Sequence, residues 1–236
     1  MSDPVLELTD VSKDYHGLRP LRISSLTVAP GEQVALLGFD QSTAEILVNL
    51  VTGATLPDRG SIRLFGRASA DISDSADWLT VVDRFGIVSR RAVLLDSLTV
   101  VQNLAMPFTL DVEPPSAEIR ARAVALAEET GLAASTLDRP VAGLDAMGRF
   151  SVRLARAVAL DPAVLLFEHP TADIDRADVA TLAARCRAVS SGRKIAAVTV
   201  TADAEFAAAA ASRVLTLEPA SGRLTSAGWF SRFRRA

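Results

Sequence analysis

Short apolar runs that alternate with helical patterns constrain the fold of this chain more than any other feature. Runs of this kind lie at 33–37 (QVALL), 164–167 (VLLF) and 194–200 (KIAAVTV). Such short runs are typical of strands that are buried on both faces of a parallel sheet. Because helical patterns separate them, the sequence predicts an α/β fold whose mainly parallel sheet is covered by helices on both faces.

Other segments predict the layers around this sheet. Residues 5–8 and 21–28 alternate apolar and polar side chains, which is typical of half-buried strands in a small antiparallel layer. A further strand is expected at 61–64. Helices are expected over the ranges 46–51, 116–130, 150–160, 176–189 and 207–211.

The middle of the chain differs from its flanks because it is mostly helical in pattern. We expect one domain over 1–236, with a core at about 1–89 and 151–236 and an inserted helical subdomain at about 90–150. In this insert, Ser116 is the expected cap of a helix that ends just before Gly131.

The composition excludes several classes of protein. The formal net charge of −3 provides no basic surface of the kind that binds nucleic acid, so no nucleic-acid partner is expected. A single cysteine, Cys186, excludes an internal disulfide framework. No stretch approaches the ~20 apolar residues that a membrane span needs, and the first residues lack the features of a secretory signal. We therefore expect a cytoplasmic protein, peripheral on the cytosolic face of the membrane, whose membrane contact is indirect.

Several segments, in their order and spacing, resemble the ATP-binding subunits of ABC transporters. They read LELTDVSKDYHG at 6–17, APGEQVALLG at 29–38, LPDRGSIRLFGR at 56–67, LTVVQNLAMPF at 98–108 and LARAVALDPAVLLFEHPTADID at 154–175. Together they extend over nearly the whole chain. The resemblance implies the ABC ATPase fold, a P-loop NTPase-like core of mainly parallel sheet with an antiparallel β layer and an inserted helical subdomain.

The segment after the first apolar run departs from the phosphate loop that this resemblance implies. A working loop reads G-x-x-x-x-G-K-[ST]: its N–H groups face the phosphates, its lysine neutralises them and its hydroxyl binds Mg²⁺. Residues 38–45 read GFDQSTAE. Ala44 therefore takes the place of the lysine and Glu45 that of the hydroxyl, while Gly38 is retained.

Carboxylates in the same segment oppose the binding of an anion. Asp40 and Glu45 would put negative charge where a triphosphate lies, and like charges ~4 Å apart in a low-dielectric pocket repel strongly. Residues 42–45 also fit the S-x-x-E capping box, in which Ser42 and Glu45 satisfy the free N–H groups of a helix start. We interpret the loop as closed by this cap; the alternative is that Glu45 is a tolerated surface residue.

Four other sites that the resemblance implies for nucleotide chemistry also differ from the family. The acidic strand ends in Glu168 and His169; Glu168 could still touch a metal, and His169 is either a general base or a structural or dimer-contact residue. Arg90 stands in place of the glutamine of the glutamine loop, and Ala202 in place of the histidine that contacts the γ-phosphate. The signature LSGGQ is replaced by LDAMG at 144–148; a shifted register onto Ala142-Gly143 is the alternative, and neither register restores the motif.

A few features keep the character of the family. Tyr15 stands where the resemblance implies an aromatic ring against adenine, so Tyr15 and Gly38 are the vestigial cofactor-binding positions; simple packing is the alternative role of Tyr15. The pair Arg90-Arg91 is interpreted as a solvated loop; contact with an acidic partner surface is the alternative. The segment GWFSRFRRA at 228–236 is either a membrane- or partner-binding segment or a partly packed tail.

These differences predict a catalytically degenerate ABC-transporter subunit, a pseudo-ATPase with a scaffold or regulatory role. No catalytic residue, metal or cofactor is expected, with ATP and Mg²⁺ bound only if residual affinity persists. The implied partners are ABC permease subunits and an intact ABC ATPase in a heterodimer. Two alternatives stay open: an ATP-binding subunit with residual ATPase activity, and a cytosolic interaction protein detached from transport.

Overall fold

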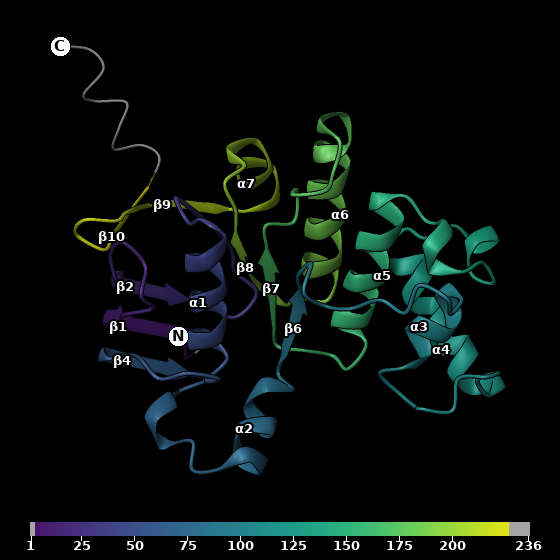
Figure 1. The fold of residues 1–236 in the computed structure, drawn as a ribbon, viewed down its shortest axis with the longest axis horizontal. Coiled ribbons are helices and arrows are strands. Elements are labelled where there is room, and N and C mark those ends of the chain that lie inside the picture. The colour runs from purple at the N-terminus through teal and green to yellow at the C-terminus, as the bar shows by residue number, and fades with distance from the viewer. Residues whose placement is uncertain (1–2, 227–236) are drawn as a thin grey trace.

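The computed structural model describes residues 3–226, which form a small sheet, a larger sheet and seven α-helices (Figure 1). The small sheet contains, in order across it, β2 (Leu21–Val28), β1 (Leu6–Lys13), β4 (Arg59–Leu64) and β5 (Arg67–Ala68). All of its pairings are antiparallel. The antiparallel layer expected from the alternating patterns is therefore confirmed.

The larger sheet has six strands and is mainly parallel. Its order is β10 (Arg223–Ser226), β9 (Arg213–Glu218), β3 (Gln33–Leu37), β8 (Ala196–Val200), β7 (Val164–Glu168) and β6 (Phe85–Val88). Only β10 pairs antiparallel, with β9. The three apolar runs from which a parallel sheet was predicted are its central strands β3, β8 and β7.

The helices cover both faces of this sheet. They are α1 (Gln41–Val51), α2 (Ser75–Val82), α3 (Val100–Ala105), α4 (Ala117–Glu129), α5 (Ala146–Val158), α6 (Val179–Gly192) and α7 (Ala204–Ala210). Short 3₁₀ turns lie at Ser69–Asp71, Ala134–Thr136, Val141–Gly143 and Arg176–Asp178. As expected, Ser116 caps α4, since its side chain accepts a hydrogen bond from the N–H of Ile119 at 3.3 Å. None of the helices within residues 3–226 has the length and apolar content needed to cross a membrane.

Two apolar cores hold these layers together, one on each face of the larger sheet. Alternate residues of β7 enter different cores: Val164 and Leu166 pack with α1 and the small sheet, whereas Leu165 and Phe167 pack with α3 to α6. Figure 1 shows α1 between the two sheets and α5 and α6 beyond the larger one. The short runs lack polar residues because both faces of each strand are buried.

Helix α5 approaches strand β6 closely. A Cβ atom added to Gly86 of β6 would lie 2.2 Å from the carbonyl oxygen of Ala157 in α5, so glycine is required there. The helix begins at Ala146, four residues before the predicted start at 150, because the side chain of Asp145 accepts a hydrogen bond from the N–H of Gly148 at 2.7 Å. The predicted tail 228–236 lies outside the described residues.

The topology brings four loops to one edge of the larger sheet. Strands β3, β8, β7 and β6 are neighbours and run parallel, so their carboxyl ends lie at the same edge. In open α/β sheets this edge is where ligands bind. The positions singled out for nucleotide chemistry lie in these loops or directly beside them, with Glu168 at the end of β7 and Ala44 and Glu45 in the helix at 41–51; Tyr15 and the 144–148 segment lie elsewhere.

Candidate functional site

The loop after β3 is short and ends in a capped helix. Gly38 has a positive φ of 89°, and a Cβ there would lie 3.1 Å from the carbonyl oxygen of Leu217, so the backbone turn itself requires glycine. Helix α1 then begins at Gln41, and the side chain of Asp40 accepts hydrogen bonds from the N–H of Thr43 at 2.8 Å and its hydroxyl at 2.7 Å. These two hydrogen bonds, of which the one from the Thr43 N–H has the larger effect, lower the pKa of Asp40. Its carboxylate is therefore ionised at neutral pH.

The predicted capping box formed by Ser42 and Glu45 is wrong. The helix starts before Ser42, which places Glu45 beyond the first turn, where it cannot reach the free N–H groups. Asp40 is the cap instead, because it directly precedes the first helical residue and its short carboxylate reaches the third.

Replacing Asp40 with alanine is expected to destabilise the fold by about 0.5–2 kcal/mol, because a helix N-cap is lost. Glu45→Ala is the matched control, with an expected cost of about 0–1 kcal/mol for an exposed ion pair. Urea unfolding of both variants measures the difference. A larger loss for Glu45→Ala than for Asp40→Ala would contradict the assignment of the cap.

Ala44 lies in the core and does not face the carboxyl edge of the sheet. Its side chain is fully buried in the core between the two sheets, together with Leu47 and Val48 of the same helix. The position at which the resemblance implies a phosphate-binding lysine is thus an apolar packing position in this structure.

A buried carboxylate at the end of β7 organises the site. The side chain of Glu168 is only 1% exposed, and each of its oxygens has a partner: Gln41 Nε2 donates to Oε1 at 2.7 Å, and Arg91 Nη2 donates to Oε2 at 2.7 Å. The other terminal nitrogen of Arg91 donates to Glu45 Oε1 at 3.0 Å. One guanidinium therefore links α1, the end of β7 and the loop after β6.

Arg90 and Arg91 are both exposed, as expected for a solvated loop, but both side chains also form ion pairs within the chain. Arg90 points to the loop after β7, where its Nε lies 2.9 Å from Asp173 Oδ2, and both of these side chains are about half exposed. Arg91 points into the site. Arg91 was not among the predicted site residues. The hydrogen bonds that Asp40 and Gln41 form in the site were not predicted either.

His169 has a strained backbone and an isolated ring nitrogen. Its φ is 44°, in the left-handed region, and its N–H donates to the carbonyl of Val200 at 2.8 Å. Within residues 3–226, the buried Nε2 atom has no hydrogen-bond partner. The ring borders a depression of about 650 Å³ that Ala202 also lines, so these two predicted positions do lie together. The general-base and structural interpretations of His169 both remain predictions.

The same depression has three carboxylates in its lining. Asp40, Asp203 and Glu205 border it, together with Arg176, whose guanidinium pairs with Asp203 at 2.6 Å and with Glu205 at 2.5 Å. Burial opposes ionisation of Asp203, but the N–H of Phe206 and the guanidinium of Arg176 on balance lower its pKa. In the part of the chain that the structure describes, no group of three or more His, Cys, Asp or Glu side chains could hold a metal ion.

Tyr15 lies close to the loop after β3. It is half-buried at the edge of the core between the sheets, and burial, together with the nearby charge of Asp40, raises the pKa of its hydroxyl. A Cβ on Gly17 would lie 2.5 Å from its ring, so the ring packs directly over the backbone there. Adenine stacking by Tyr15 stays a prediction.

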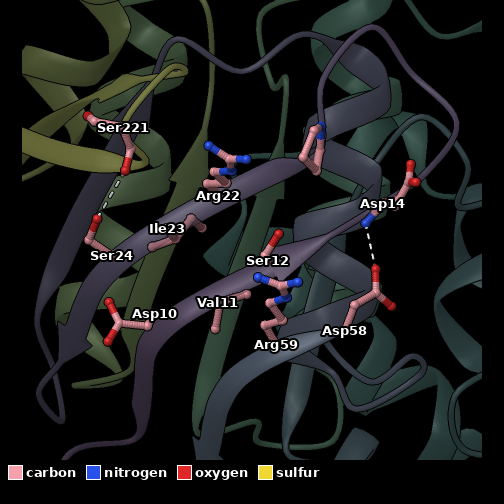
Figure 2. Close-up of a pocket in the computed structure, with 11 residues that line it drawn as sticks. Asp10, Val11, Ser12, Asp14, Arg22, Ile23, Ser24, Asp58, Arg59 and Ser221 are labelled. Carbon is pink, nitrogen blue, oxygen red and sulfur yellow. Dashed lines mark hydrogen bonds between the residues drawn. The ribbon is translucent and has the colours of Figure 1, made fainter.

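A second depression, of about 480 Å³, lies on the outer face of the small sheet (Figure 2). The polar groups that Figure 2 connects satisfy one another: Asp58 accepts from the N–H of Asp14 at 2.7 Å, and Ser24 donates to the carbonyl of Ser221 at 3.3 Å. The Ser24 bond ties the turn between β9 and β10 to the small sheet, and the Asp58 bond joins the residue before β4 to the residue after β1. The depression contains no predicted site residue, so it does not compete with the carboxyl edge as the functional site.

Comparison with known proteins identifies the family. The profile of the family described as ABC transporter matches residues 21–172. The lipoprotein-releasing system ATP-binding protein LolD of Maricaulis maris (strain MCS10) is 34% identical over 229 residues, which cover 95% of this chain and 98% of LolD.

Other similar proteins differ in length or share only the fold. The pyoverdine export ATP-binding/permease protein PvdT of Pseudomonas entomophila (strain L48) is 34% identical over 216 residues, but the chain spans only 32% of its length. The structure of CbiO1 from Clostridium perfringens, described as part of an ABC transporter complex, superimposes with a TM-score of 0.79 at 22% identity, over 95% of this chain and 88% of that one. The five parallel strands of the larger sheet, the antiparallel layer and the family profile agree. The chain therefore belongs to the ABC transporter family, as one of its ATP-binding subunits.

Proposed function

We propose that this chain is a non-hydrolysing subunit of an ABC transport system, with a scaffold or regulatory role. The observation that carries the proposal is the ion-pair network at the carboxyl edge. Arg91 and Gln41 engage both oxygens of Glu168, and Arg91 also engages Glu45. These contacts use the side chains that would otherwise have to meet a metal and phosphates.

The residues present do not fit a nucleoside triphosphate. A phosphate loop holds a nucleoside triphosphate with the free N–H groups of a helix start and with a lysine. Here Asp40 accepts from Thr43 N–H, and Ala44 is buried where the lysine would be. The neighbouring depression carries three carboxylates against one arginine that is already paired with two of them. No ATP or Mg²⁺ cofactor is therefore part of the proposal.

The partners belong to the proposal as well. PvdT is named as both an ATP-binding and a permease protein, which supports an ABC permease as the partner of this chain. Members of the family that the sequence resembles pair so that one phosphate loop faces the signature of the other subunit. Two copies of this chain would bring Asp40 and Asp145 caps to both helix starts, which favours an intact ABC ATPase as the second subunit. Such an assembly places the chain on the cytosolic face of a membrane.

Titration with ATP and Mg²⁺ tests this proposal. A competent subunit at 100 times its Kd gains about 2.7 kcal/mol of stability from its ligand. We expect no calorimetric binding signal, no change in melting temperature and no release of phosphate, with an intact ABC ATP-binding subunit as the positive control. Micromolar affinity with turnover would instead establish the alternative of residual ATPase activity.

A further inference from the structure

Two arginines on the outer face of the small sheet form no ion pair with a carboxylate of residues 3–226. They are Arg22 of β2 and Arg59 of β4, and both exposed side chains line the depression of about 480 Å³ shown in Figure 2. Arg22 Nη1 donates to the carbonyl of Ala220 across a long 3.4 Å. Both guanidinium groups therefore keep most of their donors for a ligand.

A bulge in β1 aligns these arginines with a serine hydroxyl. The pairing of β1 with β4 shifts its register just before Ser12, where Asp10 has a positive φ of 48°. The extra residue turns the side chain of Val11 into the core and leaves Ser12 on the outer face. Ser12 is then the direct cross-strand neighbour of Arg22 on one side and of Arg59 on the other.

The resulting row of side chains fits a tetrahedral oxyanion. Neighbouring strands lie about 4.8 Å apart, so the Cα atoms of the two arginines are about 10 Å apart with that of Ser12 midway. Two guanidinium groups can reach inward over this span, and their planar donor sets match the oxygens of a phosphate group. The hydroxyl of Ser12, which Figure 2 shows between the two arginines, supplies a further donor.

The carboxylates of the same depression limit the affinity for an anion. Asp58 is already paired, because one of its oxygens accepts from Lys13 Nζ at 2.8 Å and the other from the N–H of Asp14 at 2.7 Å. The charges of Asp10 and Asp14 remain, and they repel an anion in the depression. We therefore expect an affinity in the millimolar range.

We propose that Arg22, Ser12 and Arg59 bind the phosphate group of a small phosphorylated molecule. The depression has room for more than the phosphate, since small-molecule pockets usually have volumes of about 300–1,000 Å³. Its concave shape favours a small molecule over a lipid surface. The inference goes beyond the proposed function and does not rest on it, because α1 packs on the opposite face of the small sheet.

Titration with phenyl phosphate tests the inference, with the backbone amide NMR signals of β1, β2 and β4 as the readout. At constant ionic strength, we expect the signals of Ser12, Arg22 and Arg59 to shift and to saturate at millimolar concentrations. Chloride is expected to leave them in place. Arg22→Gln and Arg59→Gln are each expected to weaken binding about tenfold, because a charge-assisted hydrogen bond is lost.

Two further variants separate the row from the rest of this surface. Arg63→Gln is the matched control: Arg63 lies on the same face of β4, but its Nε is already 3.4 Å from Glu7, so the affinity is expected to stay unchanged. Ser12→Glu places a carboxylate of the chain itself between the two arginines. We expect this variant to lose phenyl phosphate binding without a lower melting temperature. If a variant does not fold, the titrations of the unaltered chain still decide.

Three results would overturn the inference: no signal shift at tens of millimolar phenyl phosphate, equal shifts with chloride, or binding to phosphatidic acid vesicles without binding of phenyl phosphate. Failure of the proposed function is recognised separately. ATP held in this depression would be lost from the combined Arg22→Gln, Arg59→Gln variant, whereas ATP held at the loop after β3 would still bind to it.

Discussion

Replacing Arg91 with alanine is expected to destabilise the fold by about 2–4 kcal/mol, because a buried carboxylate then loses its cation. Glu168 is 1% exposed and would keep only the hydrogen bond from Gln41. The Arg91 side chain is about half exposed, so water can enter the space that it leaves and reach Glu168. The expected loss of stability is therefore smaller than for breaking a fully buried ion pair. Chemical denaturation of the purified variant measures the loss.

Arg90→Ala is the matched control, since the neighbouring arginine makes an ion pair whose two side chains are 59% and 48% exposed. Its expected cost is about 0–1 kcal/mol. A combined Arg91→Met, Glu168→Leu variant is expected to recover much of the stability, because neither charge is then left without its partner. Equal losses of stability in Arg91→Ala and Arg90→Ala would refute the role of Arg91 as the counter-charge of the buried Glu168.

The sheet core could be predicted from the sequence because its strands carry a strong local signal. The predicted ranges 21–28 and 33–37 coincide with β2 and β3. Strand β6 was not predicted, because its four residues include Gly86 and are too few for a periodic pattern. Its place in the sheet depends on the close packing of α5, which is a tertiary contact.

The chemical character of the site was harder to predict than the fold. The replacement of the phosphate-loop residues is visible in the sequence, but the choice between Asp40 and Ser42 as the helix cap is not, since both residue types cap well. The inward arginine depends on the pairing of β6 with β7, which sets Val88 opposite Phe167 and so brings the following loops together. One sequence signal was available: a lone Glu168 after a buried strand requires a counter-charge, and Arg90-Arg91 follows the neighbouring strand.

Returning the family's lysine to position 44 is expected to damage this protein and not to restore nucleotide binding. Ala44 is fully buried, so Ala44→Lys would put an unpaired ammonium group and four extra heavy atoms into a packed core. We expect a loss of about 3–5 kcal/mol, from the combined cost of overpacking and of burying a charge. Thermal melting with and without ATP and Mg²⁺ measures both consequences.

The exposed Ser42, two residues earlier on α1, provides the matched control. Ser42→Lys adds the same charge to the same helix start but leaves the core unchanged, so its stability is expected to stay within about 0.5 kcal/mol of the parent. A different outcome would revise the description of the site. If Ala44→Lys folded as well as Ser42→Lys and gained affinity for ATP, the first turn of α1 would have to unwind readily into a phosphate-binding loop. The Asp40 cap, the buried alanine and the Arg91 network would then be features of only one of two accessible states.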